Sequence, residues 1–257
     1  MKRIIIASLL GLLSFFAFSE AGSEALLKKI DEKTMFSNTD YSAKYMIVQS
    51  KPGESKSNIE AEIYRRDAKS CFTILITGPA KDKGKGYVQF DSDIWFYDPK
   101  DDQFTFTEAK NKFQGTNATT ADFTPQHFAR DYDVVSTDKV KLGDLSCILL
   151  TLKAKSKKTE YQQVRLWVTE KDLLIRKKED YSLSGQLLRT MAVVGYQTVG
   201  ENSVPSTLVV RDNLKGKMIK GKMQYETTQI TISDVSFAKV NDNVYTKHYV
   251  QFAAKMR

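Results

Sequence analysis

Short runs of alternating apolar and polar residues occupy most of this chain, and this pattern restricts its fold more than any other feature. In residues 59–65, Ile59, Ala61 and Ile63 fall on one side of an extended chain, and the glutamates between them fall on the other. Such alternation is typical of β-strands that are buried on one face. Short turn signals separate the runs, among them Lys51-Pro52-Gly53, Gly78-Pro79, Ser184-Gly185 and Asp212-Asn213. Because parallel strands need long crossovers, these short turns predict an antiparallel meander.

The alternating segments number about 11–13, which is enough for one large sheet. They are 40–50, 59–65, 71–77, 86–91, 93–98, 103–107, 132–140, 145–152, 161–169, 174–181, 186–199, 206–211 and 222–236. One helix is predicted over 24–33, where Ser23 can cap the first turn and Leu26, Leu27 and Ile30 share a face. The chain has no internal repeat, linker or shift in composition, so it is interpreted as one domain.

Residues 108–131 interrupt the alternation. The segment is polar apart from Phe113, Phe123 and Phe128, and a short helix can begin at Pro125. Irregular insertions of this length in a small β domain are usually functional or mobile. We therefore expect this segment to form a movable cover over the sheet.

The N-terminus has the pattern of a secretory signal peptide. Two basic residues precede the apolar run Ile4–Phe18, and Ser19-Glu20-Ala21 offers small residues at both positions that a signal peptidase reads. The run is shorter than the roughly 17–25 residues that span a membrane. No cysteine lies near its end, so a lipid anchor is not expected. We expect residues 1–21 to be a cleaved signal peptide and residues 22–257 to form a single domain in the periplasm.

The excess of basic residues restricts the kinds of partner that this chain can bind. The chain has 39 Lys and Arg against 31 Asp and Glu, and lysines gather in 153–158 and 215–222. An exported chain rarely meets nucleic acid, so no nucleic-acid partner is expected. Lysine-rich hairpin tips are often solvated edge guards. If they have a partner, an anionic membrane surface fits best, at about 1 kcal/mol per basic side chain, and we expect that contact to be transient.

Catalytic and metal-binding patterns are weak. His127 and His248 are the only histidines, and neither lies near a Gly-x-Ser-x-Gly turn. Two Cys and two His are too few for a zinc finger or a Cys-rich scaffold. We expect no enzymatic activity, no metal and no cofactor. Cys71 and Cys147 could form a disulfide, worth about 4–5 kcal/mol for a loop of roughly 75 residues, or remain two buried free thiols.

Several motifs recur in one order along the chain. They are 72-FTILITGPAKDKGKGYVQF-90, 94-IWFYDPKDDQFTF-106, Asp131-Tyr132, Tyr161 with 164-VRLWVTEKDLLIRKKEDYSLSGQLLRT-190, and Asn243-Val244-Tyr245-Thr246 with Tyr249-Val250. In these motifs and their order the chain resembles the outer-membrane lipoprotein-sorting family, the LolA/LolB-like periplasmic carriers. The resemblance covers most of the chain beyond the signal peptide. One departure is the segment Asn111–Thr120, which is less apolar than a lid of that family should be.

The resemblance implies a mainly β fold, an unclosed antiparallel β-barrel of about 11 strands with a helical lid over a hydrophobic cavity. It also implies a carrier that binds lipid or lipoprotein acyl chains for delivery toward the outer membrane. Its partners would be lipoprotein or phospholipid acyl chains, an inner-membrane release complex and an outer-membrane acceptor. The alternative is a structural or interaction protein whose barrel core is filled by its own side chains.

Candidate lipid-binding residues follow from the apolar faces of the strands and from the cover. For the cavity wall they are Phe72, Ile74, Ile76, Trp95, Tyr97, Leu150, Leu166 and Val168, and for the cover they are Phe113, Phe123 and Phe128. Trp95 and Tyr97 are the preferred cavity residues, because aromatic side chains with a polar edge suit a partly wet mouth. Plain core packing is the alternative for each residue, since alternation defines a face of a strand but not which face is concave.

Overall fold

The alternating runs form strands, and these strands join into one antiparallel sheet. The computed structural model describes residues 20–90 and 93–256, and within these residues the sheet has 13 strands. Residues 1–19, which hold most of the expected signal peptide, lie outside the described residues. The fold is mainly β and its sheet is not closed into a barrel, as expected, and its 13 strands lie within the expected number of about 11–13.

The chain runs through the sheet in two halves. The first half comprises β1 (Tyr41–Ser50), β2 (Ser57–Arg66), β3 (Cys71–Gly78), β4 (Gly86–Phe90), β5 (Asp93–Asp98) and β6 (Gln103–Thr107). The second half comprises β7 (Tyr132–Leu142), β8 (Leu145–Ala154), β9 (Gln163–Thr169), β10 (Ile175–Tyr181), β11 (Leu187–Val199), β12 (Asn202–Ile219) and β13 (Lys222–Ser236). The α-helices are α1 (Glu20–Glu32), α2 (Phe128–Asp131) and α3 (Lys247–Met256), and the short 3-10 helices are η1 (Asp67–Lys69), η2 (Phe113–Gly115), η3 (Thr120–Phe123) and η4 (Asp242–Tyr245).

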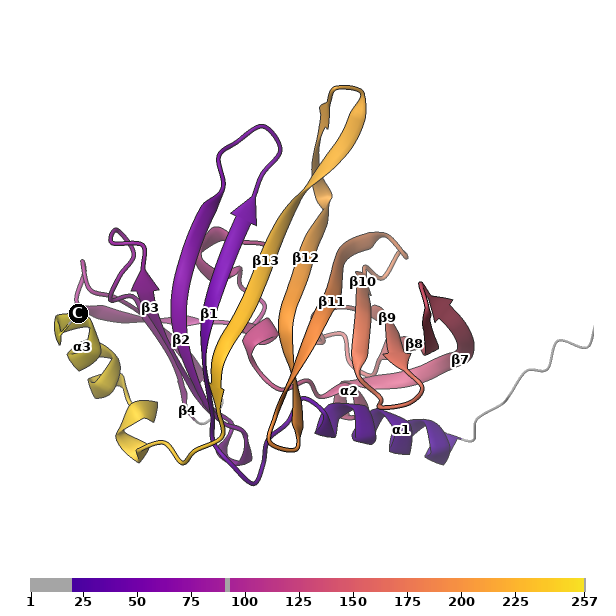
Figure 1. Cartoon of the computed structure of the whole chain (residues 1–257), viewed down its shortest axis with the longest axis horizontal. Helices are drawn as coiled ribbons and strands as arrows, with labels where there is room; N and C mark the ends of the chain where they lie inside the picture. The colour runs from indigo at the N-terminus through magenta and orange to yellow at the C-terminus, as the bar shows by residue number, and fades with distance from the viewer. Residues whose placement is uncertain (1–19, 91–92, 257) are drawn as a thin grey trace, which may run out of the picture.

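The order of the strands explains why one segment must cross the sheet. The order is β6-β5-β4-β3-β2-β1-β13-β12-β11-β10-β9-β8-β7, so β6 and β7 are the two edges although they follow one another in the chain. The link between them, residues 108–131, therefore has to pass from one edge to the other over a face of the sheet. We call this link the cover segment, and the sheet face that it contacts the inner face (Figure 1).

Three groups of buried apolar side chains hold the elements together. The largest lies on the inner face, where residues of β1–β5 and β11–β13 pack with Phe113, Ala118 and Phe123 of the cover segment. The second joins α1 and α2 to β7–β10 through residues such as Leu27, Ile30 and Phe128. The third lies on the reverse face, where α3 packs on β3–β5. Burial of these apolar side chains supplies most of the favourable free energy of folding.

Two local features differ from the expectations. Asp212-Asn213 is not a turn, because β12 continues through a bulge there while Asp212 accepts hydrogen bonds from the backbone N–H groups of Leu214 and Lys215. The hairpin turns instead at Lys220-Gly221, where both residues have positive φ. Helix α3 was also not expected, although Val250 and Ala253 recur at the helical spacing of three.

Cys71 and Cys147 do not form the disulfide that was considered from the sequence. Cys71 begins β3, whereas Cys147 lies on β8, which is eight positions away in the order of strands. A disulfide requires Cα atoms about 4.4–6.8 Å apart. Cys147 is buried, and burial raises the pKa of its thiol, which is the behaviour of a small core residue.

Candidate ligand cavity beneath the cover segment

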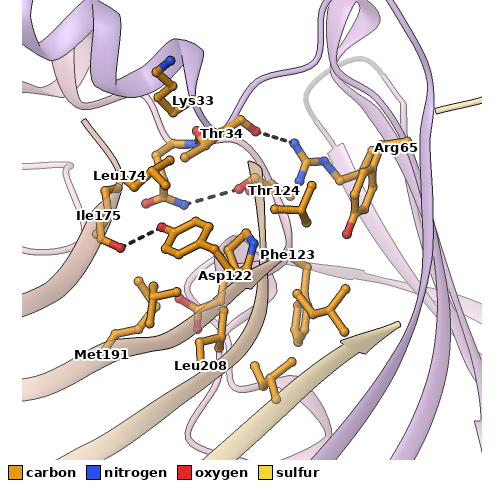
Figure 2. A pocket seen from close by; sticks show the side chains of 18 of the residues that line it. Lys33, Thr34, Arg65, Asp122, Phe123, Thr124, Leu174, Ile175, Met191 and Leu208 are labelled. Atoms are coloured by element: carbon orange, nitrogen blue, oxygen red, sulfur yellow. Dashed lines mark hydrogen bonds between the residues drawn. The ribbon is translucent and has the colours of Figure 1, made fainter. Parts of the chain in front are cut away.

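A cavity of about 100 Å³ lies between the cover segment and the inner face. Its apolar wall comes from β11–β13 and consists of Met191, Val193, Val204, Leu208, Ile230 and Ile232. Polar groups line another side, namely Thr34, Arg65, Asp122, Thr124 and Gln126. Figure 2 shows Thr34 and Arg65 at one end and Met191 and Leu208 at the other. The cavity therefore has an apolar end and a polar end.

Of the eleven residues proposed from the sequence, only Phe123 lines this cavity. Phe72, Ile74, Ile76 and Phe113 belong to the same inner-face cluster, so they pack behind the cavity and do not face into it. Phe128, Leu150, Leu166 and Val168 form part of the separate cluster beneath α1.

Trp95 and Tyr97, the preferred cavity residues, lie on the reverse face of β5. There they pack with Val250 and Ala253 of α3, and Tyr97 donates a hydrogen bond of 2.7 Å to Asp102. The expectation that they line the cavity was wrong, because the unexpected helix α3 covers that face. The alternate residues Ile94 and Phe96 of the same strand face the inner cluster.

Tilted and edge-to-face aromatic contacts hold the middle of the cover segment on the inner face. The ring centroids of Phe113 and Phe123 are 4.7 Å apart. Phe113 in turn lies 5.1 Å from Tyr87, and Phe123 lies 5.7 Å from Tyr45. Aromatic contacts at these distances add about 0.5–1.5 kcal/mol each beyond the burial of their area. Phe113 and Phe123 thus fix the cover on the first half of the sheet.

Hydrogen bonds attach the cover segment at two further points. The backbone N–H of Asn117 donates to Thr228 Oγ1 at 2.8 Å on β13. At the other end, the carboxylate of Asp31 on α1 accepts from the backbone N–H groups of Phe128 and Ala129 at 2.8 and 2.9 Å. Backbone N–H groups therefore fasten the cover to β13 and to α1. Within Asn111–Thr120, noted from the sequence as a departure from a lid, the side chain of Lys112 also pairs with Asp212 of β12 at 3.0 Å.

A buried ionic cluster forms a third attachment, and no sequence pattern predicted it. Asp122 of the cover pairs with Arg189 of β11 at 2.5 Å, and Arg189 also approaches Asp180 of β10 at 3.7 Å. Lys178 pairs with Asp180 at 3.1 Å. Burial raises the pKa of Asp122, but the charges of Arg189 and Lys178 lower it by more, so the pKa lies below its usual value. We call these four residues the ionic cluster.

A second cavity, of about 450 Å³, adjoins the first, and most of the residues that line it are polar or charged. The two cavities share Asp122, Thr124 and Gln126, so the cover segment forms the wall between them. Basic side chains line the second cavity at Arg130, Lys158, Lys178 and Arg189, together with acidic Asp131 and Glu160. His127 also lines it, and burial lowers the pKa of this imidazole.

Within residues 20–90 and 93–256, no group of His, Cys, Asp and Glu side chains is arranged to hold a metal ion. In the same part of the chain, no helix is long and apolar enough to cross a membrane.

Solved structures share this architecture over nearly the whole chain. A LolA superfamily protein from Nitrosomonas europaea superposes with a TM-score of 0.71 at 21% identity, covering 88% of this chain and 98% of the other. A DUF1329 family protein from Desulfovibrio piger gives 0.75 at 17% identity, with coverages of 90% and 99%. An outer membrane lipoprotein-sorting protein domain from Vibrio parahaemolyticus gives 0.77 at 13% identity, with coverages of 91% and 100%.

These similarities define the fold as that of the LolA-like lipoprotein-sorting proteins, which confirms the resemblance noted in the sequence. No curated protein matches the chain by sequence. A family described as uncharacterized proteins matches residues 68–251, which is more than half of the chain, and the chain belongs to that family.

Proposed function

We propose that this protein carries the acyl chain of a lipid or lipoprotein in the cavity beneath the cover segment. The observation that supports this most is the cavity itself, which has an apolar wall of aliphatic side chains from β11–β13 under a segment that crosses the sheet. Apolar burial requires no catalytic group, and a sixteen-carbon chain gains about 12 kcal/mol gross at about 0.8 kcal/mol per methylene. The LolA-like fold agrees with such a role.

The size of the cavity requires the cover to move. At about 100 Å³ it is well below the roughly 300–1,000 Å³ of pockets that hold drug-sized ligands. Phe123 lines the cavity and contacts the ring of Phe113, and its displacement would join the cavity to the space now filled by aromatic rings. We infer that the described state is the closed one and that loading shifts the cover outward.

The adjoining polar cavity suits the polar part of the same cargo. A lipid has an apolar and a polar end, and the two cavities share one wall on the cover segment. Arg130 and Lys158 could neutralise an anionic group there. In this proposal residues 22–257 are the carrier domain, exported to the periplasm by residues 1–21. An inner-membrane release complex and an outer-membrane acceptor would load and unload it.

A cavity-filling substitution tests the proposal. Val193 lines the cavity, whereas its neighbour Val194 is 67% exposed on the opposite face of β11. We expect Val193→Phe to weaken binding of a fluorescent fatty acid at least tenfold, because the ring occupies the space of the chain. Val194→Phe should leave the affinity unchanged. Titration of both variants, with thermal melts to verify folding, makes the comparison.

The competing role, a structural or interaction protein with a filled core, predicts different results. In that case organic extraction and mass spectrometry of the purified protein would detect no lipid, and the parent would bind no acyl probe. Those two results together would rule out the carrier.

A further inference from the structure

The outer part of the β12–β13 hairpin extends beyond its pairing with the flanking strands, and the β1–β2 turn at Gly53 lies close to its Lys217 and Ile219. The last register pair of β12 with β11 is Asp212 with Arg189, and the last pair of β13 with β1 is Thr227 with Ser50. Beyond these pairs, β12 and β13 contact only one another as strands within the described residues. Figure 1 shows this end of the hairpin rising above the other strands as a twisted ribbon. We call residues 213–225 the ribbon tip.

One face of the ribbon tip is apolar and exposed. Met218 and Met223 are register partners, and Gly216 pairs with Tyr225 two residues further along, so the side chains of Met218, Met223 and Tyr225 share a face. Met218 is 58% exposed and Met223 50%, and Leu214 in the same tip is 56% exposed. A two-stranded ribbon is marginal in water by itself, so exposed apolar residues on it require a further reason.

All charged side chains of the ribbon tip are lysines. Lys215, Lys217, Lys220 and Lys222 lie within residues 213–225, and this stretch contains no Asp or Glu. Each of these lysines is exposed. Lysines alone would serve as guards against edge-to-edge pairing of strands. That role does not explain flexible, exposed methionines opposite one another on the same tip.

We propose that the ribbon tip docks the protein on an anionic lipid bilayer. Lysine ammonium groups would pair with phosphate headgroups, and the apolar face would enter the boundary between headgroups and acyl chains. Polar and apolar groups are combined at one projecting end, where a flat membrane can reach them. The site is separate from the cavity, so the docking does not depend on acyl-chain binding.

Vesicle co-sedimentation of the purified chain, with its N-terminus defined by intact mass, tests the docking. One set of vesicles is phosphatidylcholine alone, and the other contains about 30 mol% phosphatidylglycerol. We expect binding to the anionic vesicles that weakens with salt, and little binding to the neutral ones. Lys217→Gln with Lys222→Gln should lower the partition coefficient about thirtyfold, at about 1 kcal/mol for each lysine. Met218→Ser with Met223→Ser should lower it about tenfold.

Two matched controls lie outside the ribbon tip. Lys153→Gln with Lys157→Gln removes the same charge from the other lysine-rich run, and Leu183→Ser with Val194→Ser removes two exposed apolar side chains. Both controls should bind like the parent. Docking by the ribbon tip would be overturned if the partition coefficients of the control variants fell as far as those of the tip variants, or if the parent bound neutral and anionic vesicles equally. It would also be overturned if the parent bound an acidic protein but no vesicles.

Discussion

Replacing Arg189 with methionine is expected to lower the free energy of unfolding by about 3–5 kcal/mol, because breaking a buried ion pair leaves an uncompensated charge. Arg189 is 6% exposed and serves both Asp122 and Asp180, so its loss leaves two buried carboxylates with Lys178 as their only cation in the ionic cluster. Urea unfolding near neutral pH measures the change. Because Asp122 belongs to the cover segment, the same variant should also increase hydrogen exchange in residues 117–124.

The loss of stability caused by Arg189→Met should depend on pH, and the pKa of Asp122 gives the direction of that dependence. The pKa of Asp122 is lower in the folded chain than in the unfolded chain, where it is about 3.9. Such a group contributes stability above its unfolded pKa and loses it as the pH falls through the folded pKa. The difference in stability between the parent and Arg189→Met should therefore shrink below about pH 4.

Lys44 provides the control for Arg189, since its ion pair with Asp234 is exposed to solvent. Lys44→Met should leave the stability unchanged, because exposed pairs contribute little. An Arg189→Met variant that unfolds at the same urea concentration as the parent would show that the ionic cluster does not hold the cover.

Truncation of Phe123 or Phe128 to alanine should destabilise the protein by about 3–5 kcal/mol in each case, as is usual for buried phenylalanines. Their effects on ligand binding should differ. Phe123 lines the apolar cavity, so Phe123→Ala enlarges it and should raise the affinity for a fluorescent fatty acid. Phe128 packs against α1 and lines only the adjoining cavity, so Phe128→Ala should change that affinity much less than Phe123→Ala. Denaturant melts and probe titrations of the two variants measure both quantities.

The result that would contradict this assignment is an equal change of probe affinity in both variants. It would mean that the cover segment moves as one rigid body, so that the affinity for the probe does not depend on which ring lines the cavity. Stability losses well below those expected would mean instead that the cover is not packed as described.

Alternation along the chain predicted strand positions and shared faces correctly, because both depend on neighbouring residues. Phe72, Ile74 and Ile76 do share one buried face of β3. Which face meets the cavity could not be predicted, because it depends on which strands the cover crosses and where α3 packs. Trp95 and Tyr97 were assigned to the wrong face for that reason.

The residues missed in the cavity have a common cause. Val204 and Leu208 on β12 and Ile230 and Ile232 on β13 form one wall of the cavity. Within each strand the two residues are separated by an even number of positions, as expected for side chains on one face. Nothing local indicates that these strands lie beneath the cover, since that follows from the order of strands in the whole sheet. The pair of Asp122 with Arg189 is equally invisible in the sequence, because these residues are 67 positions apart and no periodicity links them.

The pairing of β1 with β13 sets the order in which the chain can complete its fold. Ile47 pairs with Ile230, so the first strand waits for a partner about 180 residues further along the chain. Until β13 reaches β1, each half of the sheet has hairpins but the seam between them stays open. Joining such distant segments carries a large loop-closure entropy and is slow. During that interval β1 is an unpaired strand edge with an apolar face, so this is the stage of folding at which the chain is most exposed to pairing with another chain.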